Sequence, residues 1–136
     1  MSLDTLKELI FKARNLQLEH VEILDKYSIT QVSEIYNGIG PDRFPDWLRK
    51  IVTESASLFE AAALIHDVEY YEGGTREQFT AANDRFRRNC YTLVKDRYGW
   101  YDIRRYLWMN KARRWSNYCQ LFGWEGWNKK EEEKAT

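Results

Sequence analysis

The run from Leu58 to Ile65 constrains the fold of this chain more than any other stretch. Seven of its eight residues are apolar, and neither glycine nor proline interrupts it. A helix that is apolar on all sides is stable only when other elements cover it, so the run predicts a central helix rather than a surface one. Gly73-Gly74 ends the pattern. We therefore predict a central helix over residues 55–71.

A second long helix is predicted directly after this turn. Thr75 and Gln78 have the spacing of a capping box, in which each side chain binds the backbone N–H of the other residue. Apolar residues then recur at steps of three and four along 76–97, which predicts one buried stripe: Phe79, Ala82, Phe86, Cys90 and Leu93. Two long helices joined by a turn of about four residues pack antiparallel. The predicted fold is all-α, a single-domain helical bundle of residues 1–128 built on this antiparallel pair.

Shorter helical patterns precede the central pair. Ser2 is a suitable N-cap for a helix over 3–16, and Ser28 for a helix over 29–36. Pro45 suits the first turn of a separate short helix, because its missing N–H is not needed there. We expect these segments to cover the central helix.

The last part of the chain predicts a third long helix. The segment from Tyr101 to Phe122 keeps apolar residues at helical spacing, and Gly123 ends it. We expect Trp124 and Trp127 to fold back onto the core, and residues 129–136 to form a disordered charged tail.

The composition limits the class of protein. A length of 136 residues fits one domain, and a hydrophobic content of 43% argues against disorder. No apolar run reaches the roughly 18 residues needed to cross a membrane. The start at Met1 lacks the basic and apolar regions of a signal peptide, so we expect a cytoplasmic protein. In that reducing compartment, Cys90 and Cys119 are expected to be buried thiols rather than a disulfide.

A histidine and a carboxylate stand side by side at the end of the apolar run. Burying ionisable groups costs free energy, so His66 and Asp67 are expected to have partners or a function. Tyr70 lies four residues after His66 on the same helix face, whereas Asp67 points about 100° away. The alternative is a core histidine with satisfied hydrogen bonds beside a surface aspartate. The other histidine, His20, lies among glutamates, which predicts solvent exposure and no role.

Three short motifs resemble one enzyme family. His66-Asp67-Val68-Glu69-Tyr70 resembles the His-Asp-x-x-Tyr motif of phospholipase A2 enzymes, both the secreted kind and the form in parvovirus capsid proteins. Upstream, Tyr36-Asn37-Gly38-Ile39-Gly40 resembles the family's Tyr-x-Gly-x-Gly calcium loop. Downstream, Ala81-Ala82-Asn83-Asp84-Arg85-Phe86 resembles the viral Ala-Ala-Asp-x-x-Phe segment. The similarity covers residues 36–90, and the order of the motifs along the chain is that of the family.

The resemblance implies a calcium-dependent ester hydrolase of phage or prophage type that acts on phospholipid or another ester. A virion-associated location is then an alternative to the cytoplasm. In that family the histidine is the general base and the tyrosine braces a second helix, which assigns these roles to His66 and Tyr70. Calcium would be bound weakly, by the Asp67 carboxylate and by three loop carbonyls, those of Tyr36, Gly38 and Gly40.

Two departures from the family pattern concern the loop and the disulfides. The chain has no cysteine before Cys90, which excludes the disulfide-bonded secreted branch but not the viral one. The connection from Gly40 to His66 has 25 intervening residues and is longer than the family's usual one. For the segment from Gly38 to Pro41, an ordinary helix stop is the alternative to a calcium loop.

A third departure concerns the residue that orients the histidine, which is the aspartate of the viral segment. With Phe86 as the anchor this position falls on Asn83, and it falls on Asp84 only if the register slips by one residue. Asn83 lies four residues after Phe79 on the buried stripe, while Asp84 lies nearly opposite and is expected to pair with Arg88. We therefore predict that Asn83 orients His66. An amide fixes the histidine tautomer but does not stabilise the imidazolium, and a comparable exchange in a serine-protease triad costs about four orders of magnitude. A catalytically inactive structural or binding module of the same fold is therefore an alternative function.

The charges are unevenly distributed along the chain. The segment from Arg85 to Trp115 contains ten basic and two acidic residues, although the whole chain has no net charge. Basic residues interleaved with tyrosine and tryptophan are suited to an anionic surface, either lipid headgroups or nucleic-acid phosphates. A nucleic-acid-binding protein is thus a third possible function. The alternative is a solvated face paired with the acidic remainder.

Overall fold

The structure, a computed structural model, describes residues 2–36 and 46–128, and of residues 46–56 it describes the backbone alone. Its helices are α1 (Leu3–Asn15), the 3-10 turn η1 (Val21–Lys26), α2 (Ile29–Ile35), α3 (Asp46–Glu72), α4 (Arg76–Arg97), α5 (Ile103–Phe122) and the 3-10 turn η2 (Gly123–Gly126). No strand occurs among the described residues. The all-α fold class is confirmed.

Polar side chains cap the helices where the sequence predicts them. The Ser2 hydroxyl accepts the Thr5 N–H, which begins α1. Complete capping boxes begin α2, at Ser28 with Gln31, and α4, at Thr75 with Gln78. Because each box satisfies backbone N–H groups that have no partner within the helix, the starts of these helices follow from local sequence.

The central helix is longer than predicted. The separate short helix expected after Pro45 and the central helix expected from residue 55 are one continuous element, α3. No glycine or proline lies between Asp46 and Glu72, so nothing in the sequence breaks the backbone hydrogen bonding. Pro45 itself lies outside the described residues.

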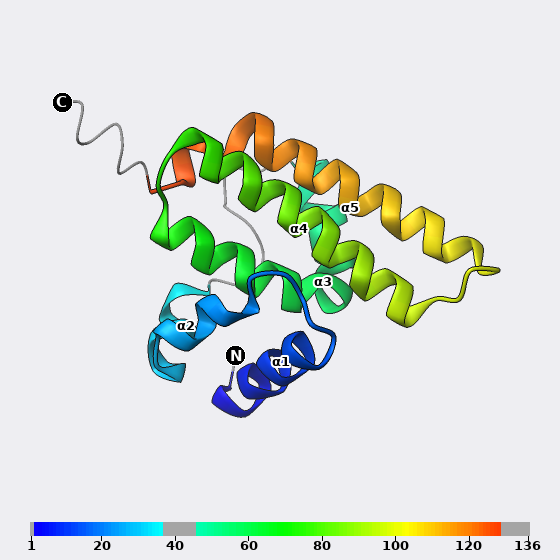
Figure 1. Ribbon diagram of the computed structural model, residues 1–136. Helices are drawn as coiled ribbons and strands as arrows, with labels where there is room; N and C mark the ends of the chain where they lie inside the picture. Colours follow the sequence, from blue (N-terminus) through cyan, green and yellow to red (C-terminus); the bar gives the residue numbers. More distant parts are fainter. Residues whose placement is uncertain (1, 37–45, 129–136) are drawn as a thin grey trace.

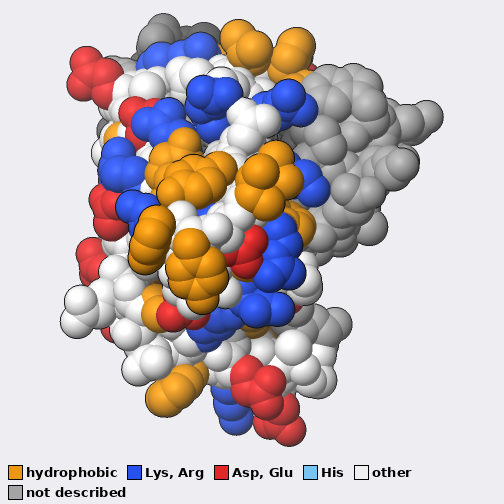
Figure 2. Space-filling view, turned by 90° about the vertical axis from the view of Figure 1, so that its right-hand side faces the viewer, with side chains coloured by type: hydrophobic (Ala, Val, Ile, Leu, Met, Phe, Trp, Pro, Cys, Tyr) orange, Lys and Arg blue, Asp and Glu red, His pale blue; other side chains and the backbone are white. Residues whose placement is uncertain are grey.

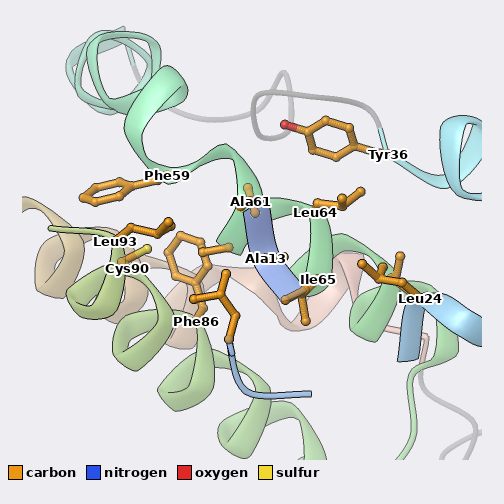
Figure 3. Close-up of a cluster of buried hydrophobic side chains, with 14 of the residues drawn as sticks. Ala13, Leu24, Tyr36, Phe59, Ala61, Leu64, Ile65, Phe86, Cys90 and Leu93 are labelled. Atoms are coloured by element: carbon orange, nitrogen blue, oxygen red, sulfur yellow. The ribbon is translucent and has the colours of Figure 1, made fainter. Parts of the chain in front are cut away.

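The other helices enclose the second half of α3 (Figure 1). α4 and α5 lie side by side and antiparallel, and α3 packs against α4, while α1, η1 and α2 cover another side of α3. α3 and α4, joined by the turn at Gly73 and Gly74, also run antiparallel, so the predicted antiparallel pair is present. Side chains from α1, η1, α3 and α4 meet in the core, including Ala13, Leu24, Leu64, Ile65, Phe86 and Leu93 (Figure 3). The apolar run thus lies at the centre, as its all-round hydrophobicity predicts.

The chain after α5 folds back and closes the turn between α3 and α4. Trp127 packs on Phe79, and its indole Nε1 donates to the Gly74 carbonyl at 3.0 Å. The Gly74 N–H in turn donates to the Asn128 carbonyl at 2.8 Å, and the Asn128 N–H to the Tyr70 carbonyl at 3.3 Å. This clasp confirms the expected folding back of the tryptophans. Residues 129–136, the predicted tail, lie outside the described residues.

The two thiols are buried and free, as expected. Cys90 and Cys119 lie in the core between α4 and α5. Burial raises the pKa of the Cys119 thiol to about 12, and the charge of Asp67 adds to this effect. Both residues are therefore small core side chains rather than reactive thiols. Within the described residues, no helix has the length and hydrophobicity needed to cross a membrane.

Candidate functional site

Three of the predicted site residues meet in one hydrogen-bond network. The His66 Nε2 lies 2.9 Å from the Asn83 Oδ1, and the Tyr70 hydroxyl donates to the same oxygen at 3.0 Å. His66 and Tyr70 come from adjacent turns of α3, and Asn83 faces them from α4. The prediction that Asn83 faces His66 is therefore confirmed.

Asp84 points away from this network, but its partner differs from the prediction. Its carboxylate lies 3.6 Å from the guanidinium of Arg87, which is three residues further along α4. The expected partner, Arg88, instead binds Glu19 through two hydrogen bonds of 2.7 and 3.0 Å. Glu19 lies in the segment after α1, so Arg88 forms a contact between distant segments instead of the local ion pair with Asp84 that its four-residue spacing predicts.

A third helix completes the network through a residue that sequence reasoning missed. The Asn83 amide Nδ2 donates to the Gln120 Oε1 at 2.8 Å, and the Gln120 Nε2 donates to the Thr80 Oγ at 2.9 Å. Gln120 lies four residues after the buried Ser116, so its place beside the buried face of α5 is visible in the sequence. The sequence does not reveal that Gln120 bonds Asn83, because this contact depends on how α5 is aligned with α4.

With the Asn83 and Gln120 amides oriented as in the structure, these contacts assign the proton of His66 to one nitrogen. Asn83 uses its Nδ2 as a donor to Gln120, so its Oδ1 is the atom that faces the imidazole. An amide oxygen only accepts hydrogen bonds, and a neutral imidazole has one N–H. The hydrogen is therefore on Nε2 of His66, and Nδ1 holds the basic lone pair.

The surroundings of His66 disfavour its charged form. The residue is 8% exposed, and the rings of Tyr70 and Phe86 lie 4.5 and 4.7 Å from its own ring, measured between centroids. Burial lowers the pKa of His66 below its ordinary value, whereas the Asn83 bond and the charge of Glu69 act in the opposite direction. His66 is therefore a neutral base at pH 7.

An ion pair between the buried Glu69 and the partly exposed Arg85 lies one helical turn from His66. Glu69 is 4% exposed, and Arg85 donates to its two carboxylate oxygens, at 3.0 Å each. The His20 Nδ1 lies 3.2 Å from the same carboxylate. His20 is therefore only partly exposed, at 33% of its side chain, and contacts α3 rather than standing free in solvent as predicted. The chain turns after α1, with His20 in the left-handed region at φ 65°, and this turn brings the ring onto α3.

The residues expected to bind calcium are described only in part. Asp67 is half-buried, and its charge contributes, after burial and the charge of Glu60, to raising the pKa of the Tyr36 hydroxyl. The charge of Asp67 thus reaches the side chain of Tyr36, the residue that begins the predicted loop. Gly38 and Gly40 lie outside the described residues. Among the side chains that the structure does describe, no group of three or more His, Cys, Asp and Glu could hold a metal ion.

Comparison with known proteins finds no relative of this chain. Neither a protein-family model, nor a curated protein, nor a solved structure matches the chain. The resemblance to phospholipase A2 therefore depends on the three motifs and on the geometry around His66, and membership of that family remains a hypothesis.

Proposed function

We propose that this protein is a phospholipase A2-like ester hydrolase in which His66 activates the attacking water. One observation supports the proposal above the others: Asn83 accepts hydrogen bonds from both His66 and Tyr70. The motif resemblance relates these same three positions to the general base, its orienting residue and the bracing tyrosine. His66 and Tyr70 share a helix face by their four-residue spacing alone, so the added support is that Asn83 of α4 lies within hydrogen-bond distance of both.

The chemistry follows from the tautomer of His66. A water bound at Nδ1 gives its proton to that nitrogen as its oxygen attacks the ester carbonyl carbon, which forms a tetrahedral oxyanion. The oxyanion then collapses, the bond to the alcohol oxygen breaks, and the leaving alcohol takes the proton from His66. The Nε2–H bond to Asn83 keeps the ring in the required orientation throughout.

In this proposal calcium, when bound, would polarise the ester carbonyl and stabilise the oxyanion. The ligands would be Asp67 and the carbonyls of Tyr36, Gly38 and Gly40. A single carboxylate among mostly neutral oxygens is suited to a weak site.

The amide at position 83 limits the expected rate. When Nδ1 takes the proton, His66 becomes a buried cation, and burial already lowers its pKa. A carboxylate at position 83 would stabilise this cation, whereas an amide does not. We expect the wild-type protein to be a slow hydrolase.

A second candidate is a catalytically inactive structural or binding module with the same fold. The completeness of the network favours it, because every buried side-chain nitrogen and oxygen among the described residues has a hydrogen-bond partner. In this case His66, Asn83 and Gln120 only tie α3, α4 and α5 together.

The test is fatty-acid release from phospholipid micelles with calcium, compared between the wild type and Asn83→Asp. If His66 is the base, the carboxylate should raise the rate, by up to about four orders of magnitude. The double variant His66→Asn with Asn83→Asp should lose the gain. If Asn83→Asp folds as the wild type does but releases no fatty acid, the inactive module is the better account.

A further inference from the structure

The turn between α4 and α5, together with the first residues of α5, exposes apolar side chains for which the proposed site has no use. Between 56% and 79% of the surface of each is exposed: Trp100, Tyr101, Ile103, Tyr106 and Leu107, which we call the apolar tip. The turn projects beyond α1 and α2 at the right of Figure 1. Figure 2 looks onto this side of the molecule and shows hydrophobic side chains gathered there, with Lys and Arg side chains beside them.

Hydrogen bonds hold the apolar tip in a defined shape. Asp102 caps α5 by accepting the Arg104 N–H at 3.0 Å, and its own N–H donates to the Gly99 carbonyl at 3.0 Å. The Tyr106 hydroxyl donates to the Trp100 carbonyl at 2.9 Å. The exposed side chains are thus presented by an ordered turn, which reduces the entropy lost when they bind.

Cations surround the apolar tip. Five basic residues lie within it or within five residues of it along the chain: Lys95, Arg97, Arg104, Arg105 and Lys111. Of the two acidic residues in the same stretch, Asp102 is bound by Arg104 at 2.7 Å. On α5, Ile103, Leu107 and Arg114 lie on one face, since they are separated by four and seven residues. An apolar end with flanking arginines is complementary to an apolar surface that has an anionic rim.

We propose that the apolar tip inserts into the interface of an anionic phospholipid bilayer. Tryptophan and tyrosine favour the headgroup region, and arginine and lysine bind the lipid phosphates. The aliphatic side chains of Ile103 and Leu107 distinguish this partner from nucleic acid, because they reach the acyl boundary but have no ring to stack on a base.

This surface lies apart from the network around His66. Asn83 and Arg97 are fourteen residues apart on α4, which places them about 21 Å from each other along the helix. The apolar tip is therefore an anchor at the opposite end of α4 and not the entrance of the proposed site. The inference does not depend on the proposed hydrolase.

The experiment is co-sedimentation with vesicles of equimolar phosphatidylcholine and phosphatidylglycerol, in EDTA so that calcium plays no part. The wild type should sediment with these vesicles and not with phosphatidylcholine alone. The pair Ile103→Ser with Leu107→Ser and the pair Arg97→Gln with Arg105→Gln should each weaken partitioning on the order of tenfold. All four side chains lie at the surface or partly exposed, and circular dichroism checks that the variants stay folded.

Matched controls come from the same chain. Leu121→Ser changes a side chain that is 73% exposed at the other end of α5, and Lys7→Gln with Lys12→Gln removes two exposed cations from α1. Both should partition as the wild type does.

Several results would overturn the proposal. The first is that the wild type does not sediment with the anionic vesicles. The second is that the control variants lose as much vesicle binding as the tip variants do. Retention by single-stranded DNA without vesicle binding would make the tip a nucleic-acid surface. Self-association that Ile103→Ser with Leu107→Ser abolishes, again without vesicle binding, would make it an interface with a second copy.

Discussion

A buried histidine that stays neutral makes the stability of this protein depend on pH. Below the ordinary value of 6.5, the unfolded chain binds a proton at His66, while the folded protein, in which burial lowers the pKa, does not. The unfolded state then binds more protons, so stability falls as the pH falls from 6.5 to the lowered folded pKa. Above 6.5 the group is neutral in both states and has no effect.

We therefore predict that His66→Gln has a weaker pH dependence than the wild type. Urea unfolding at pH values above and below 6.5 measures it. As the pH falls through this window, the free energy of unfolding should decrease more in the wild type than in the variant, because only the wild type has the histidine. Equal decreases would mean that His66 takes up a proton in the folded state.

At the scale of elements, the clasp after α5 is what holds the α3–α4 turn and, through it, Tyr70. Gly73 has a φ of +67°, and a Cβ at this position would lie 1.9 Å from the Asn128 carbonyl oxygen. The turn thus needs glycine both for its left-handed backbone and for the close approach of the last described residues. The link between the end of the chain and the network is a backbone hydrogen bond from Asn128 to Tyr70.

Trp127→Phe tests the clasp. The change keeps an aromatic ring against Phe79 but removes the indole N–H that donates to the Gly74 carbonyl. We expect a loss of about 1 kcal/mol in the free energy of unfolding, measured by urea titration. Trp100→Phe, at an exposed position, is the control and should change the value by less than about 0.5 kcal/mol. If the two variants are equally stable, the indole hydrogen bond to Gly74 contributes nothing to the fold.

For the whole molecule, calcium binding separates the hydrolase from the inactive module. A weak site has a dissociation constant of about 10⁻³ M, so about 10 mM calcium is a tenfold excess. Binding to the folded state alone would then add about 1.4 kcal/mol to the free energy of unfolding. Melts of the wild type with and without calcium should differ by a few degrees.

Asp67→Asn is the control for this prediction. It removes the one carboxylate assigned to the site and should abolish the shift. A shift that persists in Asp67→Asn would place the ion elsewhere, and no shift in either protein would favour the inactive module.

Sequence reasoning succeeds here wherever the signal is local. The run from Leu58 to Ile65 predicts the central helix because an all-round apolar surface must be covered. Thr75 and Gln78 predict the start of α4 because both partners of the capping box lie within one turn. The same period of 3.6 residues distinguishes Asn83 from Asp84, since only one of two neighbours can lie on the buried stripe.

The tertiary structure decided the contacts between distant segments. Gln120 of α5 reaches Asn83 of α4 across 37 residues, and His20, in the turn after α1, reaches Glu69 of α3 across 49. No local pattern encodes how these segments are placed against each other. Arg88 likewise binds Glu19 rather than its neighbour Asp84. Helical periodicity states which side of a helix is buried. It does not state which residue of another helix lies opposite, because that depends on how all the side chains in the core pack together.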